Sequence, residues 1–198
     1  MLTAAAAVVT PDCERVRESF LVQPTLAASS LALVAAGAWL LWRGRHLSGT
    51  ERFAASVYAV LIALAGIGSV DFHGPQTAAS QVLHDAPIVA LAIWVVAVPL
   101  ARVIQRRPIL PHPSPKLLFS TAVVAVVAVT AYWLGRTSSP WCNPDSWAQA
   151  HALWHLLIAV TLTLVGSVLW PTRTGRTQPA GTAASSSAPT FGSAGAER

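Results

Sequence analysis

The chain has 198 residues, of which 54% are hydrophobic and only 11% are charged. This balance lies outside the range of ordinary soluble domains and indicates an integral membrane protein. The net charge of +5 does not indicate nucleic-acid binding, because the basic residues lie between apolar runs instead of forming one stripe. We therefore expect the lipid bilayer as a partner and no nucleic acid.

The first 24 residues precede the first apolar run that is long enough to span a membrane. Residues 2–9 are apolar, but this run is too short to span and lacks the basic start of a signal peptide. We expect a disordered start there. Residues 1–24 as a whole are predicted to form an external N-terminal segment.

Five apolar runs are long enough to cross a hydrocarbon core of about 30 Å, which takes about 20 helical residues. They cover residues 25–42, 53–72, 82–103, 117–134 and 148–170. The predicted fold class is all-α, a polytopic membrane bundle of about five transmembrane helices, in one domain over residues 25–170. Residues 171–198 are rich in Thr, Ser, Gly, Ala and Pro, a composition that predicts a disordered tail.

The lysine and arginine residues of the loops predict the orientation of the chain. If the N-terminus is outside, ten of them lie on the inner side and three on the outer side. The positive-inside rule then places the start of the chain outside and its tail in the cytoplasm, in the cell membrane. Cys13 and Cys142 both fall outside, where an oxidising compartment favours a disulfide between them, the alternative being two free thiols.

Polar side chains gather at the predicted outer ends of three of these runs. A charged group inside a bilayer costs about 2.5–3.5 kcal/mol or more without a partner, so such residues are functional candidates. Residues four apart share one face of a helix, which pairs Ser69 with His73 and His151 with His155. The remaining candidates, at the start of the third run, are His84 and Asp85.

This set of residues suggests a metal centre that activates water. Three histidine nitrogens with an open fourth position are the ligand set of catalytic zinc, and His73, His151 and His155 could supply them. Asp85 could then act as the general base, and Ser69 could donate a hydrogen bond to the oxyanion or orient the water. The plainer alternatives are interfacial histidines and a serine that only packs between helices.

Three motifs carry a resemblance to a known family. They are Gly66-Ile-Gly-Ser-Val-Asp-Phe-His73, then Gln81-Val-Leu-His-Asp-Ala-Pro87, then His151-Ala-Leu-Trp-His155. Together they resemble the signature of the alkaline ceramidases, in a divergent, bacterial-type form. That family belongs to the CREST superfamily of membrane hydrolases, which includes the adiponectin receptors. Its N-terminal segment is similar, more loosely, to Cys13-Glu14, Gln23-Pro24 and Ser29-Ser30-Leu31.

The resemblance implies a zinc-dependent enzyme that cleaves the amide bond of an N-acyl lipid. By it, His73, His151 and His155 are the Zn²⁺ ligands, and Ser69 and an acid on the third run complete the site. The family has seven spans, whereas we expect five. Its calcium-binding acids are only partly represented, by Asp12 and Glu14, so calcium is not predicted.

The position of the acid differs between this sequence and the family pattern. In an ungapped alignment the family's aspartate falls on His84, and Asp85 falls on the next column. We assign the base to Asp85 because the chemistry needs an acid. His84 is kept as a shuttle or an alternate ligand.

Two other classes of function remain open at this point. One is a b-type haem protein with two of these histidines as axial ligands, and the other is a non-catalytic, receptor-like membrane protein on the same scaffold. Haem requires two histidines on different helices and no nearby carboxylate base, so three histidines clustered with Asp85 favour zinc. The sequence specifies neither the acyl chain nor the oligomeric state.

Overall fold

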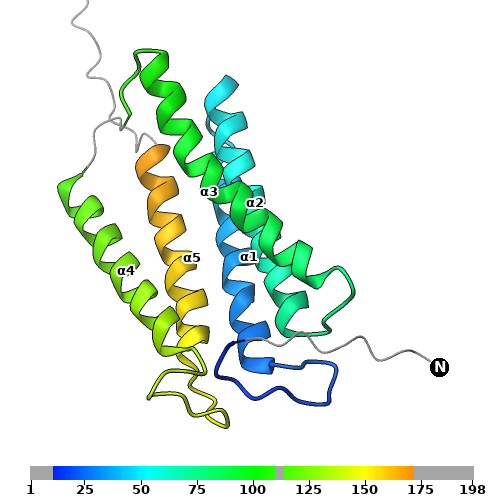
Figure 1. Cartoon of the computed structure of the whole chain (residues 1–198). Helices are drawn as coiled ribbons and strands as arrows, with labels where there is room; N and C mark the ends of the chain where they lie inside the picture. The colour runs from blue at the N-terminus through cyan, green and yellow to red at the C-terminus, as the bar shows by residue number, and fades with distance from the viewer. Residues whose placement is uncertain (1–10, 110–113, 172–198) are drawn as a thin grey trace, which may run out of the picture.

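The computed structural model describes residues 11–109 and 114–171, and this part of the chain is a bundle of helices (Figure 1). The five helices are α1 (Pro24–Gly44), α2 (Gly49–His73), α3 (Ser80–Ile104), α4 (Pro115–Leu134) and α5 (Ala150–Leu169). All five are long and apolar enough to cross a membrane. The prediction of an all-α membrane bundle with five spans is confirmed. The start that we predicted to be disordered and all but the first residue of the predicted tail lie outside the described residues.

The helix ends follow the local sequence closely. Pro24 and Pro115 occupy the first turns of α1 and α4, where the fixed φ of proline suits a helix and its missing N–H costs nothing.

Helix α2 begins at Gly49, four residues before the predicted apolar run. The extra turn contains Glu51 and Arg52, so hydropathy alone places its start too late. Charged residues extend helices into the interface without adding to an apolar run.

The helices are arranged so that α3 and α4 are the outermost pair. Helix α2 packs against α1 and α3, α1 packs against α5, and α5 packs against α4 (Figure 1). Helices α3 and α4 do not contact each other. The core lies where α1, α2 and α5 meet, around the fully buried Tyr58, Ala59 and Ile62. Most side chains of α3 and α4 therefore face outward, toward lipid.

A buried arginine fastens three helices at one end of the bundle. Nη2 of Arg102, in α3, donates to Oε2 of Glu51 at 2.7 Å and to the carbonyl oxygen of Leu169 at 3.0 Å. The second bond satisfies a backbone acceptor at the carboxyl end of α5, where a positive charge is favoured. The guanidinium also lies 5.8 Å from the ring centroid of Trp170. These contacts join the start of α2 to the ends of α3 and α5.

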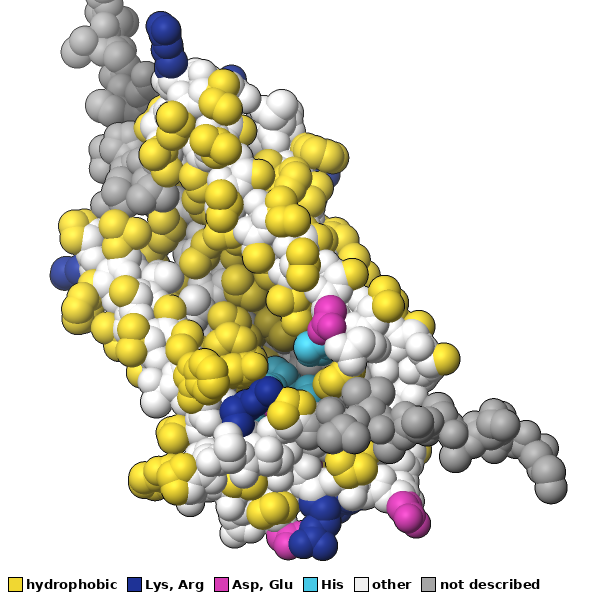
Figure 2. All heavy atoms as spheres, in the orientation of Figure 1, with side chains coloured by type: hydrophobic (Ala, Val, Ile, Leu, Met, Phe, Trp, Pro, Cys, Tyr) yellow, Lys and Arg dark blue, Asp and Glu magenta, His cyan; other side chains and the backbone are white. Residues whose placement is uncertain are grey.

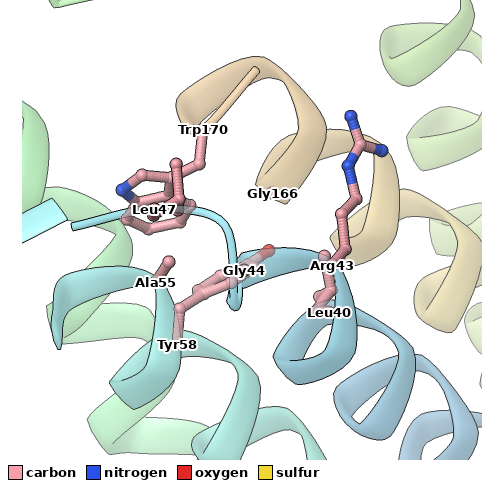
Figure 3. A pocket seen from close by; sticks show the side chains of 8 residues that line it. All are labelled: Leu40, Arg43, Gly44, Leu47, Ala55, Tyr58, Gly166 and Trp170. Carbon is pink, nitrogen blue, oxygen red and sulfur yellow. The ribbon is translucent and has the colours of Figure 1, made fainter. Parts of the chain in front are cut away.

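The same end contains a small cavity of about 20 Å³ between α1, α2 and α5. Tyr58 and Trp170 form part of its wall (Figure 3). The hydroxyl of Tyr58 donates to the carbonyl oxygen of Leu162 at 2.7 Å. The cavity has room for about one water molecule. It lies opposite the end at which α2 finishes and α5 begins, which we call the histidine end (lower end in Figure 1).

We expect the histidine end to face the outside of the cell, since the loop charges favour that orientation. A reporter fused after Arg198 should then register as cytoplasmic, and one inserted before Cys13 should register as external. The measurement is the activity of a paired reporter that is active on only one side of the membrane. A tail found outside would contradict the orientation while leaving the bundle unchanged.

Candidate metal centre

Three histidines meet at the histidine end of the bundle. His73 is the last residue of α2, and His151 and His155 lie in the first two turns of α5. One nitrogen from each ring lies within 4.8 Å of the other two, close enough to hold one metal ion. The side chains are buried, with exposed fractions of 1%, 6% and 3%. The three ligands nominated from the sequence are thus brought together by the fold.

Two close helix contacts make this meeting possible. A Cβ atom on Gly68 would lie 1.9 Å from the carbonyl oxygen of Leu83, so only glycine lets α2 and α3 approach this closely. A Cβ atom on Gly135 would lie 2.4 Å from the backbone nitrogen of His151. The first contact sets α3 beside His73, and the second sets the end of α4 against the start of α5. Small residues serve this purpose in membrane helix packing generally.

The surroundings of His73 fix which of its ring nitrogens carries the proton. The side-chain amide of Gln23 donates to the carbonyl oxygen of Glu14 at 2.9 Å, which leaves its Oε1 facing Nδ1 of His73, also at 2.9 Å. An amide oxygen only accepts, so Nδ1 donates the hydrogen bond. Nε2 of His73 then carries a lone pair, and this atom is buried without a hydrogen-bond partner.

The surroundings of His155 likewise fix the position of its ring proton. Nδ1 of this ring lies 2.9 Å from Oγ of Ser29 and 3.3 Å from Oγ of Ser30. Both hydroxyls donate their single proton to the carbonyl oxygen of Leu26, at 3.0 Å and 2.7 Å. The serine oxygens can therefore only accept from His155, which places the proton on Nδ1 and a lone pair on Nε2.

His151 faces a carboxylate that the sequence analysis did not assign to the site. Its Nδ1 lies 3.1 Å from Oδ1 of Asp12, although the two groups are not aligned as a hydrogen bond. Arg136 donates to the same oxygen at 3.0 Å. Burial raises the pKa of the Asp12 carboxyl, but His151, His73 and Arg136 together outweigh burial and lower it. The negative charge this close to Nδ1 attracts the ring proton, which favours the tautomer of His151 with the proton on Nδ1.

The three rings therefore present acceptor nitrogens toward one buried point. Lone pairs that converge without a donor repel each other, and a buried acceptor without a partner costs about 1–3 kcal/mol. A cation at this point would satisfy all three nitrogens. In metal sites the ligating histidine typically donates its other ring N–H to a carbonyl, carboxylate or similar acceptor. The residues present fit a metal bound by three imidazoles.

Ser69 lies beside the same point. Its Oγ is 3.5 Å from Nε2 of His155 and 2.8 Å from Oγ of Ser30, and the side chain is buried. Because Ser30 donates its proton to Leu26, Ser69 must donate to Ser30. A hydroxyl one turn before His73 in α2 is therefore within reach of a group held by the three histidines.

Asp85 and His84 lie at the edge of the centre and have different surroundings. The Asp85 side chain is half exposed, and its carboxylate binds Nδ1 of His84 at 2.7 Å and the amide of Gln81. The His84 ring stacks on Phe72, with centroids 4.6 Å apart, and its centroid lies 6.2 Å from that of His73. Of the two, His84 is the residue beside the centre, and Asp85 contacts it from the outside.

A segment at the start of the chain closes the histidine end. This N-terminal strap, residues 11–23, carries Asp12 and Gln23 and is joined to the loop between α4 and α5 by the predicted disulfide, Cys13–Cys142. Glu14 caps α1, since its two carboxylate oxygens accept from the backbone nitrogens of Thr25 and Leu26, each at 2.9 Å. Glu14 therefore acts as a side-chain cap at the amino end of α1.

Two hollows lie near the centre. Figure 2 shows histidine side chains at the lower end of a hollow between α3 and α4, with apolar side chains along both helices. A cavity of about 760 Å³ lies between α1, α5 and the loop before α5. Its lining is mostly apolar and includes Leu134, Trp147 and Leu153, together with Ser29 behind the His155 ring.

A scan against protein-family models, a search of the curated proteins and a search of the solved structures found no match to this chain. The resemblance to the alkaline ceramidases rests on the sequence motifs alone. The chemistry of the site therefore carries the functional inference.

Proposed function

We propose that this protein is a membrane-embedded, zinc-dependent hydrolase that cleaves the amide bond of an N-acyl lipid. The observation that carries the proposal is the convergence of three buried histidines whose Nδ1 atoms all face acceptors, which leaves their Nε2 atoms for a metal. The bundle around them has five helices that can cross a bilayer. Because the site lies within this membrane bundle, we expect the substrate of the hydrolase to be a lipid.

Zinc is the metal that suits this donor set best. Three neutral imidazoles with an open position are typical of catalytic zinc, whereas magnesium and calcium prefer oxygen ligands. His73, His151 and His155 would hold the ion. When bound, zinc lowers the pKa of water to about 7 and polarises the carbonyl that is attacked.

The remaining polar residues have matching roles in amide hydrolysis. His84 lies beside the centre and its Nδ1 is bound by Asp85, so the pair can accept the proton of the attacking water and pass it to the leaving amine. Asp85 remains our candidate for the acid of this pair, and it acts through His84. When a substrate is bound, the hydroxyl of Ser69 would turn from Ser30 and donate to the oxygen of the attacked carbonyl.

The shape of the bundle supports a lipid as the substrate. Helices α3 and α4 do not contact each other, and the hollow between them leads along apolar side chains to the histidines (Figure 2). Exposed apolar residues on these helices include Ile88, Ile93 and Val123. A substrate with an acyl chain could enter sideways from the bilayer and present its amide to the centre.

The haem alternative is less favoured by the same geometry. Axial histidines bind a haem iron from opposite faces of a broad ring. Here the nitrogens of all three histidines lie within 4.8 Å of one another, and their Nδ1 sides are packed against protein. This arrangement suits a small ion.

The proposal predicts zinc and chelator-sensitive amidase activity in the purified protein. Detergent-purified protein should contain about one zinc per chain and no Soret band, because the three imidazoles form a single zinc site. It should release a fatty acid from at least one member of a panel of N-acyl sphingoid and other N-acyl lipids. Activity should fall when a chelator removes the metal and return when zinc is added.

Two other results would contradict the proposal, each in its own way. A Soret band without zinc would favour the haem protein. Stoichiometric zinc without hydrolysis of any lipid in the panel would favour the non-catalytic receptor-like protein.

A further inference from the structure

We propose that Asp12 is a positioning residue for the metal centre, which acts through His151 and is held in place by the disulfide-linked N-terminal strap. This inference rests on the proposed function, because it assumes that His151 binds a metal. Asp12 lies outside the apolar helices, in the N-terminal strap. The affinity of the site for a metal would therefore depend on this strap.

The Asp12 carboxylate is buried beside the ring of His151. It is 5% exposed, and Oδ1 lies 3.1 Å from Nδ1 of His151. That nitrogen is buried and has no hydrogen-bond partner in the described part of the chain. A carboxylate buried this deeply is costly unless it is paired, and the pairs available to it are Arg136 and His151.

A carboxylate behind the His151 ring would strengthen this histidine as a metal ligand. A charged acceptor behind the ring holds the proton on Nδ1, fixes the ring orientation and makes Nε2 a stronger donor to a metal. Gln23 and Ser29 occupy the corresponding positions behind His73 and His155, and both are neutral. Asp12 is thus the one charged acceptor among these three, and His151 is the ligand that it would strengthen.

The N-terminal strap fixes the position of Asp12. The next residue, Cys13, forms the disulfide to Cys142, and its backbone nitrogen donates to the carbonyl oxygen of Gly135 at 2.8 Å. The carbonyl oxygen of Pro11 accepts from the backbone nitrogen of Thr137 at 2.9 Å. The backbone on both sides of Asp12 is therefore tied to the chain that leads into α5.

Asp12 also binds Arg136, so a purely structural role must be separated from positioning. The strap offers a matched control in the ion pair between Arg15 and Asp145, 2.6 Å long and exposed. It joins the same two segments but does not touch a histidine. Asp145→Asn removes the charge that pairs with Arg15, whereas Asp12→Ala removes the carboxylate behind His151.

The test is zinc affinity, measured by competition with a chromogenic chelator on the full-length protein in detergent. Asp12→Ala should weaken zinc binding about 10–100-fold, the range for loss of an outer-shell partner. Asp12→Asn keeps an acceptor oxygen but loses the charge, so its affinity should lie between Asp12→Ala and wild type. Asp145→Asn should stay within about threefold of wild type. Cobalt-substituted protein should show a shifted visible spectrum in Asp12→Ala and an unchanged one in Asp145→Asn.

The outcomes separate this inference from the function on which it rests. If wild-type protein binds no zinc, the proposed function fails and this inference fails with it. If wild type binds zinc and both Asp12 variants bind it equally well, only the role of Asp12 is overturned. An equal loss of affinity in Asp145→Asn and Asp12→Ala would overturn it too, since tethering would then be the cause. Should Asp12→Ala not fold, the comparison of Asp12→Asn with wild type decides.

Discussion

Replacement of any one of His73, His151 and His155 by alanine is expected to empty the metal site and abolish lipid hydrolysis. Each change removes one of three ligands, and two imidazoles hold zinc far more weakly than three. The loss of affinity should exceed the factor of about 10–100 that follows removal of an outer-shell partner. Zinc content per chain and turnover, measured on the same preparation, check this result.

His46→Ala is the matched control for these three variants. His46 is an exposed histidine between α1 and α2, at the end of the bundle opposite the centre. Its loss should leave both zinc content and turnover unchanged. Full zinc retention in all three ligand variants would refute the assignment of the metal to these histidines.

His84→Ala is expected to lower turnover by about 10²–10⁴-fold while zinc content stays near one per chain, because general acid–base groups contribute about this much. The His84 ring lies beside His73 and receives its orientation from Asp85. Asp85→Asn should also lower turnover with zinc retained, and by less, since this half-exposed side chain acts through the ring.

The comparison of these two variants decides which residue carries the proton. If Asp85→Asn loses about 10²–10⁴-fold in turnover and His84→Ala is near wild type, Asp85 acts directly, without His84 as intermediary. If His84→Ala loses its zinc, His84 is a fourth ligand. Gln81→Ala is a suitable control, because Gln81 donates to the Asp85 carboxylate on the exposed side.

The helical bundle follows from the sequence alone. Length and apolarity are properties of a local stretch of chain, so the five spans could be predicted from composition alone, to within a few residues at most ends. The charged first turn of α2 was missed, since Glu51 and Arg52 do not look like part of an apolar run. The disulfide between Cys13 and Cys142 followed from the expected topology and is present.

The sequence also nominated the three histidines correctly as a group that can meet. Spacing of four residues placed His151 and His155 on one face of a helix, and the predicted alternation of spans placed His73 at the same end. The histidine cluster of the structure consists of these same residues. That they bind a metal, and what reaction follows, stay predictions.

The residues that lie behind each histidine follow from the tertiary structure and not from the sequence pattern. Asp12, Gln23 and Ser29 are far from their partners in sequence, and no periodicity relates them to His151, His73 and His155. Motif resemblance drew attention to Gln23 and Ser29 without assigning them a role, and it gave Asp12 no role in the metal site. Such contacts depend on how the strap folds over the helix ends, which a one-dimensional pattern does not encode.

The tertiary structure likewise decided the relation between His84 and Asp85. Both residues lie in the first turns of α3, and adjacent positions on a helix point about 100° apart, so only one of them can face the centre. The rotation of α3 is set by its close contact with α2, where Gly68 meets the backbone of Leu83. That packing turns His84 toward His73 and Asp85 toward the surface, a choice that depends on helix rotation and not on the local sequence.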